Sequence, residues 1–110
     1  MPLQPLGLLQ GTVDVLILKT LSRNPLHGYG ISEFIRRQTS GDLAVEDAAL
    51  YQALHRLERK GLVESEWGLS ESNRRARIYS ITPGGRKQLR SEVVELRRYV
   101  AALFRVLEPA

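Results

Sequence analysis

The chain has 110 residues, 43% of them hydrophobic, and a formal net charge of +4. This length is typical of one domain with its own hydrophobic core. The absence of cysteine excludes disulfide scaffolds, thiolate metal sites and cysteine nucleophiles. The apolar runs are far shorter than the roughly 18 residues of a membrane span. A secretory signal begins with basic residues, but here the first basic residue is Lys19. We therefore expect a cytoplasmic protein that does not associate with membranes.

The positive charge is unevenly distributed along the chain. Residues 1–46 have a net charge of 0, residues 47–77 of +1 and residues 78–110 of +3. Residues 73–77 contain three arginines and no acid. A basic cluster of this kind is a candidate site for a polyanion, depending on where the fold places it.

The first half of the chain predicts an arm and two short helices. Residues 1–10, with two prolines and several leucines, are typical of an extended arm that packs on another surface. Apolar residues at positions 13, 16, 17 and 21 have helical spacing, and Pro25 follows the end of that helix. A glycine-rich turn at 27–30 leads to a second helix, with apolar positions 31, 34 and 35, which ends at Gly41.

A third helix is predicted from Asp47, its N-cap, to Lys60, with Gly61 as the terminating residue. Its apolar residues at positions 50, 53, 54 and 57 share one face. The other face is polar and basic, and the single carboxylate of Glu58 lies beside the apolar stripe. The candidate contact residues on this outward face are Tyr51, Gln52, His55, Arg56 and Arg59.

Residues 62–67 and 76–82 alternate between apolar and polar side chains as strands do. The polar residues 68–75 between them predict an antiparallel hairpin with a long mobile tip. We expect Trp67 in the core of the hairpin. The basic cluster then lies at the tip, where the candidate contact residues are Asn73, Arg74, Arg75 and Arg77.

The last helix begins at Thr82, a helix cap, and Pro83, and it extends to about position 107. Its apolar residues are separated by 4, 3, 4, 3 and 4 positions, the spacing of a helix that packs lengthwise on another helix. A helix of this length spans roughly 37 Å, more than one small core covers. We therefore expect a homodimer, to which the arm contributes, with a seam formed by Leu89, Val93, Leu96, Val100, Leu103 and Leu107.

Three helices followed by a hairpin define a winged helix-turn-helix, a mainly α fold with a small β-hairpin. The predicted organisation is an arm at 1–10, the winged helix at 11–82 and a dimerisation helix at 83–110. An α-helix fits the major groove of DNA, where arginine and glutamine read base edges, and a basic wing follows the backbone or enters the minor groove. The expected partner is therefore double-stranded DNA.

Five successive motifs resemble those of the PadR family of bacterial transcriptional regulators: LQGTVDVLIL, PLHGYGI, LYQALHRLE, NRRARIY and TPGG. The resemblance extends over roughly residues 8–105 and is to the short type with a single C-terminal dimerisation helix. It implies a homodimeric repressor that binds a palindromic operator and, in some members, leaves it when a small molecule binds. It also implies a phosphate contact through the hydroxyl of Tyr51.

Two positions depart from the family pattern. Family members usually have Ser or Thr where this chain has Ala49, and Pro where it has Gln52. The change at position 49 removes a hydroxyl that could contact a phosphate. The glutamine adds a side chain able to read bases, so the operator sequence cannot be taken from relatives.

The candidate residues also have structural interpretations. Tyr51 could seal the edge of the core, and Arg56 and Arg59 could be solvated charges. The turn at 27–30 could serve geometry alone, although the amides of the helix that follows could bind a phosphate. An effector pocket between the dimer helices and the DNA-binding cores, lined by Trp67, Tyr99 or Phe104, is implied by the resemblance only.

The sequence argues against an enzyme. The two histidines are 28 positions apart, and no carboxylate pair, phosphate-binding loop or metal-ligand spacing is present, so we expect neither a metal nor a cofactor. The alternative to a DNA-binding regulator is a winged-helix module whose third helix contacts another protein.

Overall fold

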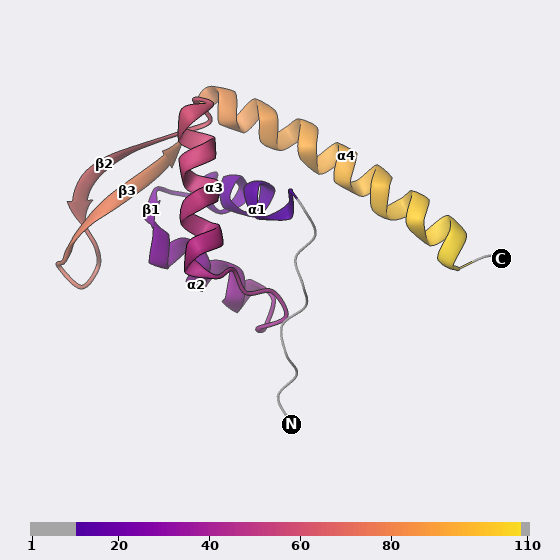
Figure 1. The fold of residues 1–110 in the computed structure, drawn as a ribbon, viewed down its shortest axis with the longest axis horizontal. Helices are drawn as coiled ribbons and strands as arrows, with labels where there is room; N and C mark the ends of the chain where they lie inside the picture. Colours follow the sequence, from indigo (N-terminus) through magenta and orange to yellow (C-terminus); the bar gives the residue numbers. More distant parts are fainter. Residues whose placement is uncertain (1–10, 109–110) are drawn as a thin grey trace.

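The computed structural model describes residues 11–108, so the predicted arm at 1–10 lies outside the described residues (Figure 1). The elements in chain order are α1 (Thr12–Leu21), β1 (Leu26–His27), α2 (Gly28–Gln38), α3 (Asp47–Arg59), β2 (Val63–Leu69), β3 (Arg75–Ile81) and α4 (Pro83–Leu107). The prediction of a mainly helical chain with a small sheet and a long C-terminal helix is confirmed.

The core is built around α1. Ile17 and Leu18 of this helix have no solvent exposure, and α1 contacts α2, α3, α4 and β3. The apolar face of α3 closes the core from the other side, as its helical spacing predicted. The remaining buried apolar residues are Val15, Leu21, Ile31, Ile35, Val45, Leu50, Ala53, Leu54, Leu57, Val63, Tyr79 and Leu89.

The sheet has three strands in the order β1-β3-β2, one more than the predicted hairpin. The additional strand, β1, pairs Leu26 with Tyr79 and His27 with Ile78. The segment 27–30 was expected to be a turn, but His27 belongs to this strand and α2 already begins at Gly28. The hairpin itself is confirmed, but β2 continues to Leu69 and β3 already begins at Arg75, so the tip is shorter than expected. Backbone hydrogen bonds between Ser70 and Arg74, and between Asn73 and Ser70, close a tight turn.

The helix ends follow simple capping rules, with one difference from expectation. Gly61 has a φ of +74° directly after α3, as expected for a terminating glycine. Asp47 is not the N-cap of α3. The N-cap is Glu46, whose side chain makes no capping hydrogen bond, and Asp47 instead places its negative charge in the first turn, near the positive end of the helix dipole.

The joint between the sheet and α4 is tightly built. The hydroxyl of Thr82 accepts the amide N–H of Gly85 at 3.0 Å and donates to the carbonyl of Gly61 at 2.7 Å. Gly85 lies so close to the preceding chain that a Cβ built on it would be 2.1 Å from the carbonyl oxygen of Leu62. This contact fixes the direction in which α4 leaves the core.

Beyond this joint, α4 projects away from the rest of the chain (Figure 1). Leu89 is buried in the protomer's own core and Val93 packs against that core. The later positions of the predicted seam, Leu96, Val100, Leu103 and Leu107, are all exposed. The apolar stripe of α4 therefore has two parts, of which only the second lacks a partner among residues 11–108.

Adjacent glycines at the start of α4 allow a matched test of the joint. We expect Gly85→Ala to cost about 2 kcal/mol of unfolding free energy, because the new methyl group would overlap backbone atoms that cannot move aside. Gly84→Ala should be neutral or stabilising by about 0.5 kcal/mol, since its Cβ would meet no atom closer than 3.7 Å and alanine favours the helix. Thermal melting followed by circular dichroism measures both variants, and equal melting temperatures would contradict the close contact.

Candidate nucleic-acid interface

The outward face of α3 is polar, basic and solvent-exposed. Leu50, Ala53, Leu54 and Leu57 point into the core, which turns the opposite side of the helix outward. Four of the five predicted contact residues, Tyr51, Gln52, His55 and Arg59, are exposed there, and so is Ala49. This face can offer amide, imidazole and guanidinium groups to a ligand at the same time.

Arg56 is placed differently from the other four. Its guanidinium Nη2 lies 2.7 Å from Oδ1 of Asp14 on α1, so its charge already has a partner within the chain. The ion pair joins α3 to α1 at the edge of the core. Helical spacing placed Arg56 on the outward side, but spacing alone contains no information about a carboxylate 42 positions away.

Tyr51 packs against the first turn of α2. A Cβ built on Gly28 would lie 2.6 Å from the Tyr51 hydroxyl oxygen, so the close approach of the two helices depends on a glycine at that position. The hydroxyl is thereby held beside the N-terminus of α2, where amide groups carry a partial positive charge. Tyr51 is half exposed, and it thus lies at the edge of the core.

Arg75 and Arg77 share one face of the hairpin with buried core residues. Arg77 is opposite Trp67 and Arg75 is opposite Leu69, on the side that continues from the Val63–Ile81 and Ser65–Tyr79 pairs. Nε of Arg77 donates to Oγ of Ser65 at 3.0 Å, and Ser65 donates to the Glu58 carboxylate of α3 at 2.7 Å. The arginine-bearing face of the wing is therefore connected to α3.

Trp67 is not in the core of the hairpin, contrary to expectation. The residue is 57% exposed. The guanidinium carbon of Arg75 lies 4.6 Å from the ring centroid, and that of Arg77 lies 5.6 Å from it. Both distances are within the range of cation–π attraction.

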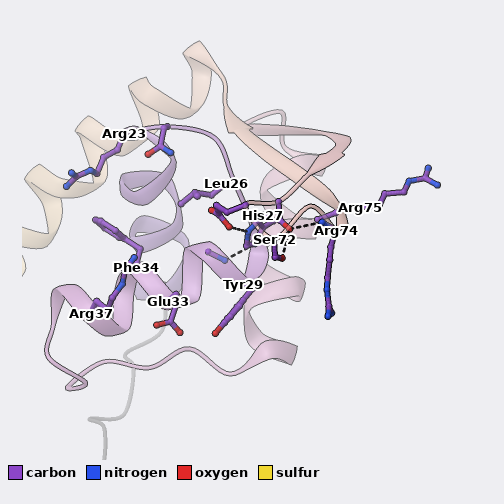
Figure 2. Close-up of a pocket in the computed structure, with 15 residues that line it drawn as sticks. Arg23, Leu26, His27, Tyr29, Glu33, Phe34, Arg37, Ser72, Arg74 and Arg75 are labelled. Atoms are coloured by element: carbon purple, nitrogen blue, oxygen red, sulfur yellow. Dashed lines mark hydrogen bonds and ion pairs between the residues drawn. The ribbon is translucent and has the colours of Figure 1, made fainter.

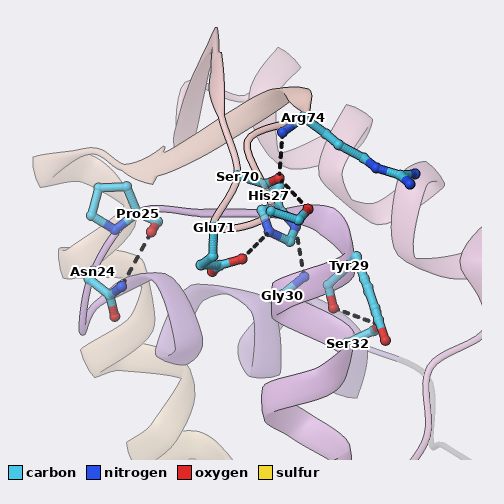
Figure 3. A network of polar contacts seen from close by, with 10 residues as sticks. Asn24, Pro25, His27, Tyr29, Gly30, Ser32, Ser70, Glu71 and Arg74 are labelled. Carbon is cyan, nitrogen blue, oxygen red and sulfur yellow. Dashed lines mark hydrogen bonds and ion pairs between the residues drawn. The ribbon is translucent and has the colours of Figure 1, made fainter.

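Asn73 and Arg74 form the turn at the wing tip. Asn73 has a φ of +62°, a left-handed conformation that asparagine tolerates better than most residues. Arg74 is exposed, and its side chain points away from the turn (Figure 3). The wing thus presents arginines in two directions, with Arg75 and Arg77 on the α3 side and Arg74 at the tip.

His27 connects the wing tip to α2, a contact that the sequence analysis missed (Figure 3). Its Nδ1 accepts the amide N–H of Gly30 at 3.0 Å and so caps α2. Its Nε2 lies 3.3 Å from Oε2 of Glu71 on the wing. This hydrogen bond lowers the pKa of the Glu71 carboxyl below its ordinary value. No local pattern could have indicated a pair 44 positions apart.

A cavity of about 930 Å³ lies between α2 and the wing tip (Figure 2). Its lining includes Phe34 and Arg37 from α2 and Arg74 from the wing, together with Arg23, whose guanidinium carbon lies 5.1 Å from the centroid of the Phe34 ring. Neither Trp67 nor the aromatic residues of α4 line this cavity.

Residues 11–108 contain neither a cluster of metal-ligating side chains nor a membrane-spanning helix. No group of three or more histidine, aspartate or glutamate side chains in this range could hold a metal ion. None of the helices described is long and apolar enough to cross a membrane.

Known proteins share both the sequence pattern and the fold. Residues 17–91 match the model of the transcriptional regulator PadR-like family. The chain is 34% identical to the transcriptional regulator Rv3488 of Mycobacterium tuberculosis, over 83% of this chain and 84% of that protein. It is 36% identical to a transcriptional regulator of Clostridium thermocellum, with a TM-score of 0.73 over 86% of this chain and 94% of that one.

A more distant structure extends the comparison. Bacillus subtilis PadR, solved in complex with operator DNA, shares the fold at 17% identity, with a TM-score of 0.68 over 78% of this chain and 49% of that one. The family model covers α2, α3 and the whole wing, so it includes every residue of the candidate interface. The resemblance found in the five motifs is confirmed, and the chain belongs to the PadR-like family of transcriptional regulators.

Proposed function

We propose that this regulator is a homodimeric repressor that binds a palindromic DNA operator in a sequence-specific manner. The observation that carries the proposal is the continuity of one surface. The exposed face of α3 is joined through Glu58 and Ser65 to the face of the wing that holds Arg75 and Arg77. The operator complex of Bacillus subtilis PadR supports it through the shared fold.

In this proposal α3 enters the major groove. Gln52, His55 and Arg59 are exposed and long enough to reach base edges, where glutamine pairs with adenine and arginine with guanine. The hydroxyl of Tyr51 and the N-terminal amides of α2 contact a phosphate and fix the helix in register. Arg56 contributes less than the others, because a DNA contact would compete with its ion pair to Asp14.

The wing contributes mainly electrostatic affinity. Arg74, Arg75 and Arg77, with Asn73 in the turn, follow the phosphate backbone or enter the minor groove beside the α3 site. Contacts with the phosphate backbone are sequence-independent, so they add to the affinity for every duplex.

We place the dimer contact on the outer part of α4. Leu89 and Val93 pack on the protomer's own core, so the interface begins at Leu96 and includes Val100, Leu103 and Leu107. A dimer with a two-fold axis through this interface presents two copies of α3 to two equivalent half-sites. This symmetry accounts for a palindromic operator. A small molecule that repositions the protomers would release the operator. No metal or cofactor enters the proposal.

Salt dependence tests DNA binding directly. We expect selection from a pool of random duplexes to enrich a palindrome, and the affinity for it to fall steeply with salt, because each phosphate contact releases about 0.9 counterion. Fluorescence anisotropy at several salt concentrations gives the slope. Binding without salt dependence, or equal affinity for scrambled duplexes, would favour the protein-interaction module instead.

Substitutions should separate base reading from backbone binding. Gln52→Ala should change the ranking of operator variants by about 10-fold at one position of each half-site, since one bidentate contact contributes about 1–3 kcal/mol of discrimination. Replacing Arg74, Arg75 and Arg77 together by alanine should weaken all duplexes and flatten the salt slope without altering that ranking. An unchanged ranking in Gln52→Ala would show that Gln52 reads no base.

A charge in the proposed seam tests the dimer. Val100→Asp should shift the protein to a monomer at micromolar concentration, because the carboxylate would be buried without a partner. Val94 is also an exposed valine of α4, but it lies outside the seam, so Val94→Asp is the matched control and should stay dimeric. Analytical ultracentrifugation measures both, and a dimeric Val100→Asp variant would place the interface elsewhere.

A further inference from the structure

The most exposed aromatic surface of the wing is on the side that faces α3. Alternation along β2 places Trp67 on the same face as the buried Val63, two pairs farther from the core. An indole with more than half of its surface in water contributes little to folding at that position. Its neighbours are therefore the better guide to its role.

Those neighbours are two of the proposed DNA-binding arginines. The guanidinium groups of Arg75 and Arg77 lie 4.6 and 5.6 Å from the Trp67 ring centroid. Arg77 is also held by Ser65, and Ser65 by Glu58 of α3. A chain of contacts thus extends from the C-terminal half of α3 through Ser65 and Arg77 to the indole.

The opposite face of the wing has the opposite charge. Glu64 pairs with Ser80 and Glu66 with Ile78, so both carboxylates point away from the Trp67 side. A phosphate backbone would be repelled from that face and attracted to the face of Arg75 and Arg77. The guanidinium groups of Arg75 and Arg77 therefore need to stay on the Trp67 side if they are to contact a phosphate backbone.

We propose that Trp67 is a positioning residue, which holds Arg75 and Arg77 on the α3 side of the wing in the orientation needed to bind the backbone of the duplex that α3 enters. The proposal rests on the proposed function. Stacking uses the flat face of a guanidinium and leaves its N–H groups, which lie in the plane, available for phosphate oxygens. Arginines held in this way lose less conformational entropy when DNA binds.

The experiment compares Trp67→Phe with Trp67→Leu in the full chain. Phosphate contacts are independent of sequence, so a short duplex of arbitrary sequence at about 50 mM salt is a sufficient probe. We expect Trp67→Leu to weaken binding about 5- to 10-fold and to reduce the salt slope by about one, whereas Trp67→Phe stays within about 3-fold of the native chain. Leu69→Ala, an exposed apolar change on the same face, is the control and should have little effect.

Two further readouts separate positioning from a folding effect. The melting temperatures of the Trp67 variants should match that of the native chain, because the side chain is mostly exposed. In nuclear magnetic resonance spectra of the DNA-free protein, ring currents should shift the side-chain methylene signals of Arg75 upfield, and Trp67→Leu should abolish this shift.

The outcomes are distinguishable. Native binding by Trp67→Leu, with a weakened double variant Arg75→Gln/Arg77→Gln, would overturn the positioning role and leave the proposed function intact. An equal loss in Trp67→Phe and Trp67→Leu would also overturn it, since the aromatic face would not be the determinant. A native chain that binds no duplex at low salt would instead overturn the proposed function, and this inference with it.

Discussion

The burial of α1 is the constraint on which the rest of the structure depends. Ile17 and Leu18 are completely enclosed, and full burial of each contributes about 2 kcal/mol. Because α2, α3, α4 and β3 all contact this one helix, their relative orientations are set together. The ion pair of Asp14 with Arg56 adds a directional contact between α1 and α3 at the edge of the same core. A surface made from α3 and the wing can therefore be rigid near its centre in a chain this small.

The outer wing is held by a different kind of interaction. Only Val63 and Tyr79 of the hairpin are buried, and burial raises the pKa of the Tyr79 hydroxyl, with the Glu58 carboxylate as a second cause. Beyond them the side chains of the wing are held by polar and cation–π contacts, such as those of His27 with Glu71 and of Trp67 with Arg75, which are individually weak in water. Stability thus decreases from the base of the wing to its tip, as is common in segments that adapt to a ligand.

The sequence predicted those features that depend on local pattern. Helical spacing identified the buried face of α3, and the cap at Thr82 was evident because hydroxyl, proline and glycines occur in a fixed order. A strand of two residues has no alternation to detect, so β1 was not predicted and its second residue, His27, was assigned to a turn. Alternation predicted the side of the sheet on which Trp67 lies, but it contains no information about how far the core extends, which is why Trp67 was expected to be buried. The residues of the candidate interface were likewise predictable only where local pattern determines their position. The exposed residues of α3 were found from spacing, whereas the partners of Arg56 and His27 depend on tertiary contacts.

The close packing of Gly85 on the Leu62 carbonyl has a geometric consequence for the far end of the molecule. The 25 residues of α4 form a rod of roughly 37 Å, which packs on the core as far as Val93 and projects away from it beyond that residue. A rotation of about 10° where α4 leaves the core at Val93 would displace Leu107, about 21 Å along the helix, by roughly 4 Å. The rod therefore acts as a lever. Small rotations of the projecting part of α4 are magnified into larger changes in the distance between its far end and the outward face of α3.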